Sequence, residues 1–161
     1  MALKIRAREP HDRPAILACM REMQNWERTI DARLAAADDV IERLWREILQ
    51  DCDVFHGTIF VAELDGRVVG YIGVLTHVPQ DHTDEIDYVY AQVTDLVVLE
   101  QFRSQGIGTA LLAQAKKHAR DAGVHWLRIN VLAGNPAAAA LYRRCGFRDR
   151  EIVLEHDLFP A

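Results

Sequence analysis

The chain has 161 residues, of which half are apolar and 27% are charged, with a formal net charge of -5. A chain of this length can bury a sizeable core, and we expect one domain over residues 1–161. The acidic balance argues against a nucleic-acid partner, because phosphate binding requires a basic face. The three cysteines lie far apart and form no C-x-x-C pair, so neither a disulfide framework nor a metal site is predicted.

Targeting and membrane signals are not found in the sequence. The opening stretch, "MALKIRAREP", lacks the apolar segment of a secretory signal. No uninterrupted apolar run is long enough to span a bilayer. We therefore expect a cytoplasmic protein that has no membrane partner.

The N-terminal part predicts one strand and two helices. Residues 3–8 alternate apolar and basic side chains, which predicts a strand with one buried face. Asp12 followed by Pro14 is typical of a helix start. Apolar side chains at helical spacing then predict helices over about 16–26 and 40–48. We interpret the methionine and aromatic residues on these helices as core packing.

A β-hairpin is predicted over residues 57–77. Two β-branched runs flank Asp65-Gly66, a dipeptide suited to a tight turn with positive φ. Residues 78–87 are polar and acidic, which predicts a loop. Residues 88–99 are first alternating and then continuously apolar, and they predict a further strand.

The C-terminal half alternates helices and strands. The helix that begins at the glycines of residues 106–108 is predicted to end at about Ala122, with Gly123 as its cap. The pattern then predicts a strand over 124–132, a loop and helix over 133–146, and closing strand material over 147–159. The expected fold class is mixed α/β, with helices on both faces of a mixed sheet.

Residues 103–109, "RSQGIGT", place two glycines where the strand over 88–99 passes into a helix. A helix N-terminus has unpaired N–H groups and a positive dipole end, and glycines let an anion approach the backbone. A tight turn from strand to helix is the alternative explanation. Two familiar phosphate loops do not fit, because the Walker lysine and the third glycine of the dinucleotide fingerprint are missing.

Two motifs together resemble the GNAT superfamily of N-acetyltransferases. Residues 103–108 fit R-x-x-G-x-G, and residues 135–147 fit N-x-x-A-x-x-L-Y-x-x-x-G-F, in the family's order. The resemblance implies a three-layer fold whose central mixed sheet has about six or seven strands. It also implies acetyl-CoA as the cofactor.

The resemblance further implies which residues bind the cofactor. The pantetheine arm would lie between the strand ending at Leu99 and the strand around 128–131, where it pairs with free backbone groups. A backbone N–H of the first strand would stabilise the developing oxyanion. The residues that match cofactor contacts are Leu96, Val97, Val98, Arg103, Ser104, Gln105, Gly106, Ile107, Gly108, Thr109, Asn135 and Tyr142.

The implied reaction is direct attack of a neutral amine on acetyl-CoA. Tyr142 matches the family's tyrosine that donates to the leaving thiolate, although packing on the sheet is an alternative role. Asn135 precedes a proline, so we interpret it as a helix N-cap first and a cofactor contact second. The identity of the general base that deprotonates the amine is left open: Asp95 is one candidate, and Glu100 acting through water is another. Gln92 stands where some relatives carry a glutamate.

The acceptor is expected to be the primary amine of a cationic small molecule or peptide. The acidic loop over 78–87 carries Asp81, Asp84, Glu85 and Asp87, and it would concentrate cations if it borders the acceptor entrance. A solvated surface loop is the alternative. A catalytically inactive coenzyme A-binding regulatory module is the competing function. The oligomeric state is open, with a homodimer common among relatives.

Overall fold

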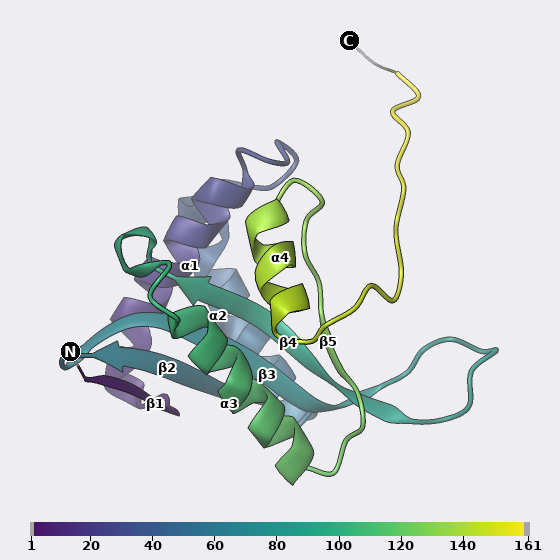
Figure 1. Ribbon diagram of the computed structural model, residues 1–161. Coiled ribbons are helices and arrows are strands. Elements are labelled where there is room, and N and C mark those ends of the chain that lie inside the picture. Colours follow the sequence, from purple (N-terminus) through teal and green to yellow (C-terminus); the bar gives the residue numbers. More distant parts are fainter. Residues whose placement is uncertain (1, 160–161) are drawn as a thin grey trace.

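The computed structural model describes residues 2–159, which form a five-stranded sheet with helices on both faces (Figure 1). Neighbouring strands follow the order β1-β2-β3-β4-β5, and all pairs are antiparallel except β4 with β5, which is parallel. The strands are β1 (Leu3–Ala7), β2 (Thr58–Leu64), β3 (Arg67–Pro79), β4 (Val89–Val98) and β5 (Leu127–Ile129). The sheet is therefore mixed, as the sequence predicts.

The helices cover the sheet in two layers. The helices are α1 (Arg13–Glu27), α2 (Ala37–Val54), α3 (Ile107–Asp121) and α4 (Pro136–Arg144), with 3-10 turns η1 (Pro10–Asp12) and η2 (Glu100–Phe102). Alternate side chains of a strand point to opposite faces. Ile59 and Val61 of β2 accordingly pack with α1 and α2, whereas Phe60 and Ala62 pack with α3. None of these helices is long and apolar enough to cross a membrane.

The predicted hairpin turn is confirmed by its backbone geometry. Asp65 has φ 49° and Gly66 has φ 82°, so both central residues adopt the left-handed conformation that a type I′ turn requires. Gly123, with φ 77°, follows α3 as the predicted cap. The turn and cap residues in the sequence therefore predict both of these chain reversals correctly.

The prediction for the C-terminal strands is wrong in two respects. The strand expected over 124–132 is limited to β5, and the chain over 147–159 forms no strand. The described sheet thus has five strands instead of six or seven. A strand requires a partner edge with free N–H and C=O groups, and the edge strand that precedes this segment, β5, is three residues long. The segment after α4 instead extends away from the fold (Figure 1).

Candidate active site

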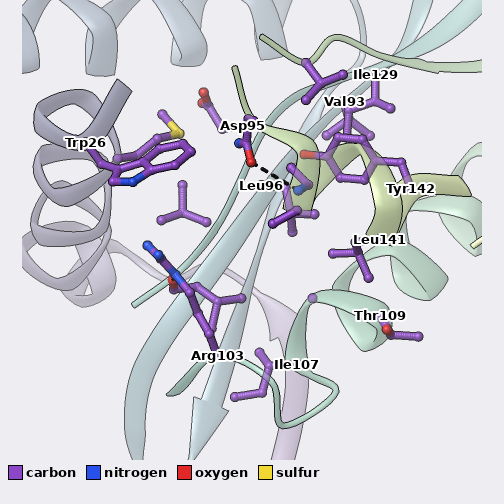
Figure 2. A pocket seen from close by; sticks show the side chains of 18 of the residues that line it. Trp26, Val93, Asp95, Leu96, Arg103, Ile107, Thr109, Ile129, Leu141 and Tyr142 are labelled. Atoms are coloured by element: carbon purple, nitrogen blue, oxygen red, sulfur yellow. Dashed lines mark hydrogen bonds between the residues drawn. The ribbon is translucent and has the colours of Figure 1, made fainter. Parts of the chain in front are cut away.

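The site is a cavity that opens where β4 and β5 separate. The two strands pair only between Ala91–Leu127 and Val93–Ile129, and β4 then continues to Val98 without β5 beside it. The resulting gap belongs to a cavity of about 880 Å³ whose walls also include α1, α4 and the start of α3. Figure 2 shows Trp26 of α1 on one side of this cavity and Tyr142 of α4 on the other. The separation of the strands expected from the resemblance is therefore present.

Almost every predicted site residue lines this cavity. The exception is Gln105, which is not among the lining residues. The cavity also includes side chains that sequence reasoning did not assign to it, notably Trp26, Glu27, Asn130 and Arg144. The predicted residues that line it are Asp95, Leu96, Val97, Val98, Arg103, Ser104, Gly106, Ile107, Gly108, Thr109, Asn135 and Tyr142.

The free edge of β4 faces the gap through alternate residues. In an antiparallel strand, successive residues direct their N–H and C=O groups to opposite sides. Leu99 N donates to a carbonyl of β3 at 3.0 Å, whereas the Val98 carbonyl accepts from Arg103 Nε at 2.9 Å. By the same alternation, the backbone groups of Leu96 face the gap and those of Val97 face β3. The strand therefore offers both backbone groups of Leu96 and the N–H of Val98 to a ligand.

The start of α3 supplies free backbone donors at one end of the cavity. The first helical bond runs from Ala110 N to Gly106 O at 3.0 Å. The N–H groups of Ile107, Gly108 and Thr109 consequently have no acceptor one turn earlier in the helix. Gly106 has φ 80°, and a Cβ there would meet nothing within 4 Å. Together these features make an open, anion-binding helix terminus.

Gly108 and Asn135 also have structural roles. A Cβ on Gly108 would lie 3.1 Å from Leu141 Cδ2, so this glycine allows α3 and α4 to approach each other. Asn135 Oδ1 accepts from Ala138 N at 3.1 Å, which is the predicted N-cap of α4. Both residues line the cavity as well, so packing and ligand binding are compatible at these positions.

Two arginines stand at the cavity, in different environments. Arg103 donates to the Val98 carbonyl and forms an ion pair with Glu22 at 3.2 Å. Arg144 lines the cavity from the last turn of α4 and makes no ion pair or side-chain hydrogen bond with the residues described. No sequence pattern distinguishes Arg144 from the neighbouring Arg143, which pairs with Asp149 at 3.0 Å.

A β-bulge directs Asp95 into the cavity. Thr94 and Asp95 lie together opposite Gly73 of β3, so β4 holds one extra residue there. A Cβ on Gly73 would lie 2.2 Å from Thr94 Oγ1 and 2.9 Å from Ile48 Cδ1. Only glycine therefore fits opposite the bulge.

The pKa values of the two candidate catalytic groups are both raised by burial. Burial raises the pKa of Asp95 to about 6, with a smaller contribution from the negative charge of Glu27. Burial raises the pKa of Tyr142 to about 12, and the charges of Glu27 and Asp95 act in the same direction. At pH 7 the site thus holds an ionised carboxylate and a protonated phenol.

The acidic loop after β3 contributes nothing to the cavity walls. Asp81, Asp84, Glu85 and Asp87 do not line it. Glu85 instead accepts from Tyr88 at 2.6 Å and pairs with Arg150 at 2.5 Å. The carboxylates that do line the cavity are Glu27 and Asp95, which come from α1 and β4.

Comparisons with known proteins agree with this architecture. An uncharacterized N-acetyltransferase of Methanocaldococcus jannaschii is 30% identical over 126 residues, covering 71% of this chain and 74% of that protein. An aminoglycoside N(6')-acetyltransferase type 1 of Stenotrophomonas maltophilia is 32% identical over 120 residues, covering 73% of this chain and 74% of that protein. The solved structure of AAC(6')-Iy with the bisubstrate analogue CoA-S-monomethyl-acetylneamine aligns with a TM-score of 0.68 at 19% identity, over 99% of this chain and 100% of that chain. Residues 20–147 match the Acetyltransferase (GNAT) family, so the chain belongs to this family and is an acetyltransferase.

Proposed function

We propose that the protein transfers an acetyl group from acetyl-CoA to a primary amine by direct attack in a ternary complex. One observation carries the proposal: a single cavity has the free N–H groups of α3 at one end and Asp95 with Tyr142 at the other. The first group suits an anionic diphosphate, and the second suits proton transfer at an amine and a thioester.

The residues present fit acetyl-CoA. Gly106 leaves open space beside the unpaired N–H groups of α3, and Arg144 adds a positive charge without a protein partner among the residues described. Leu96 and Val98 offer backbone groups to the amides of the pantetheine arm, as an added strand would require. When bound, acetyl-CoA supplies a thioester whose acetyl carbon a neutral amine attacks, with the coenzyme A thiolate as leaving group.

Asp95 accepts the proton of the acceptor's ammonium group in this proposal, either directly or through water. Its pKa of about 6 keeps it ionised at pH 7 and makes it a stronger base than an ordinary aspartate. The alternative positions do not reach the cavity: Gln92 Nε2 donates to Val93 O at 2.9 Å, and Glu100 is exposed and not a lining residue. Asp95 is the carboxylate on β4 that faces the ligand.

Tyr142 stabilises the leaving sulfur. Its pKa of about 12 lies well above that of an ordinary thiol, so full proton transfer to the thiolate is uphill. The phenol therefore acts by donating a hydrogen bond as negative charge develops on sulfur. A backbone N–H of Leu96 or Val98, facing the gap, is placed to donate to the thioester oxygen.

Neighbouring arginines on α4 provide a test of cofactor binding. We expect Arg144→Ala to weaken coenzyme A binding about tenfold, equivalent to about 1.4 kcal/mol. Arg143→Ala is the matched control, because Arg143 pairs with Asp149 and does not line the cavity. Calorimetric titration with coenzyme A measures both. If the two variants bind coenzyme A with equal affinity, Arg144 does not contribute to cofactor binding.

A thiol-release assay separates the enzyme from a coenzyme A-binding regulatory module. With acetyl-CoA and a panel of primary amines, we expect free thiol to appear at a rate that depends on the amine. A binding module would show coenzyme A affinity in calorimetry but no amine-dependent thiol release.

A further inference from the structure

A second, smaller cavity lies between α1, α2 and β4. Its volume is about 230 Å³, and it meets the cofactor cavity at Met23, Glu27, Thr94 and Asp95, which line both. A molecule in the second cavity can therefore place one end beside Asp95, where the proposed reaction takes place. This volume corresponds to roughly eight water molecules, which suits a short acceptor with a similar number of non-hydrogen atoms.

The charge of this second cavity is strongly negative. Glu27, Glu47, Asp51 and Asp95 line it, and no lysine, arginine or histidine is among its lining residues. Among the residues described, the side chains of Glu27 and Asp51 make no ion pair or hydrogen bond. Glu47 has only an exposed partner, Arg43, at 3.7 Å. Gathering like charges without cations costs free energy unless a ligand compensates them.

One buried hydroxyl group at this cavity also lacks a partner. Thr94 Oγ1 is covered and makes no hydrogen bond, although Thr94 lines both cavities. Tyr71, by contrast, is fully buried and lines neither cavity, and its hydroxyl lies beside the Asp95 carboxylate, where it lowers the pKa of Asp95. A buried polar group without a partner is rare and costly, so the Thr94 hydroxyl points to a polar ligand group between it and the carboxylates.

We propose that Glu27, Glu47, Asp51 and Asp95 form an acidic subsite that selects acceptors with a second cationic group, such as short aliphatic diamines. The reacting amine lies at Asp95, and the second ammonium lies towards Glu47 and Asp51 on α2. These two residues are four positions apart, so they share one helix face. The inference rests on the proposed acetyl transfer and adds the class of acceptor.

Three amines of equal chain length test the subsite. These are 1,5-diaminopentane, pentylamine and 5-aminopentanoate, whose distal groups are cationic, apolar and anionic. We expect kcat/KM to be about tenfold higher for the diamine than for pentylamine, and lowest for 5-aminopentanoate. Equal values for the diamine and pentylamine would overturn the proposal.

Two aspartates of the same helix supply a variant and its control. We expect Asp51→Asn to lower the ratio of kcat/KM for the diamine to kcat/KM for pentylamine most of the way towards one. Adding Glu47→Gln should remove the rest of the preference. Asp53→Asn should retain the full preference, because Asp53 is exposed and lines neither cavity. If Asp51→Asn and Asp53→Asn lose the same share of the diamine preference, general surface charge explains the preference and the subsite is overturned.

A binding measurement tests the acidic subsite independently of the acetyl transfer. Calorimetric titration of 1,5-diaminopentane into coenzyme A-loaded protein should give an affinity that Asp51→Asn lowers about tenfold and Asp53→Asn retains. If no amine is acetylated but this pattern appears, the proposed reaction fails and the subsite stands. If amines are acetylated but the diamine shows no binding advantage, the subsite fails and the reaction stands.

Discussion

Tyr142 combines a packing position with a proposed chemical role. It contacts the core cluster beneath α3, and its hydroxyl points into the cavity (Figure 2). Its raised pKa of about 12 favours a hydrogen-bonding role over full proton donation. Removing the hydroxyl alone separates these two contributions.

We expect Tyr142→Phe to lower kcat by about 10²-fold, because a positioned donor to a reacting group contributes on this order. The affinity for acetyl-CoA and the Tm should change little, since the ring and its contacts remain. Steady-state kinetics, calorimetry and a thermal melt measure the three quantities. Preserved kcat with a lowered Tm would leave Tyr142 with a packing role alone.

In the proposed mechanism, Asp95 links both activity and stability to pH. Its folded-state pKa of about 6 lies above the ordinary value of 3.8, so the folded protein binds this proton more tightly than the unfolded chain. Stability from this group is present below about pH 4 and is lost as the pH rises through about 6. The proposed base function has the opposite requirement, because Asp95 must be ionised to accept a proton.

We therefore expect Asp95→Asn to be slower by 10²-fold or more, and to lose the ionisation near pH 6 from its kcat/KM profile. The Tm difference between the variant and the wild type should shift in favour of the variant between pH 4 and pH 8. An unchanged pH profile would exclude Asp95 as the base.

The residues that were hard to predict are those placed by tertiary structure. The glycine-containing loop and Tyr142 belong to contiguous motifs, so their sequence neighbourhood revealed them. Arg144 looks identical to Arg143 until α4 is docked beside the cavity. Glu47 and Asp51 have a detectable signal, the four-residue spacing on α2, but only the packing of α2 against β4 turns that face into a cavity wall.

At the scale of elements, the bulge in β4 organises the site. It places Thr94 and Asp95 opposite Gly73, whose missing side chain leaves room for Thr94 Oγ1 and Ile48. The sequence predicted the strand but not the bulge, because an alternating pattern does not show which residue of a strand is the extra one. The site thus depends on a glycine in the neighbouring strand.

We expect Gly73→Ala to displace the bulge, because its Cβ would meet Thr94 Oγ1 at 2.2 Å. Activity should fall at least tenfold, and the Tm should fall as well. Gly66→Ala is a control in the same hairpin: its Cβ would meet nothing within 4 Å, and the cost there is the positive φ of 82°. That control should lower the Tm but retain kcat. Full activity in Gly73→Ala would show that the bulge position does not matter.

For the whole molecule, local patterns predicted the order of elements better than the size of the sheet. Helical spacing, the Asp65-Gly66 turn and the cap at Gly123 are short-range signals, and each was confirmed. Residues 147–159 were also predicted to form strand material, yet a strand forms only when another edge accepts its hydrogen bonds. Ile152, Val153, Leu154, Leu158 and Phe159 are between 73% and 91% exposed as a result.

We expect removal of the residues after Phe147 to change the Tm by no more than about 2 °C. The described part of this segment buries little apolar surface, and its ion pairs are exposed contacts of small value. A thermal melt of the shortened chain beside the full chain measures the effect. A large drop in Tm would show that these apolar side chains are covered in solution.

In the proposed function, this cavity transfers acetyl groups from acetyl-CoA to amines. The most direct measurement is mass spectrometry of amines incubated with acetyl-CoA carrying a ¹³C-labelled acetyl group. We predict a labelled amide on 1,5-diaminopentane, formed in equal amount with free coenzyme A, and strongly reduced in both Asp95→Asn and Tyr142→Phe. Tight binding of coenzyme A without a labelled product on any amine would contradict the account.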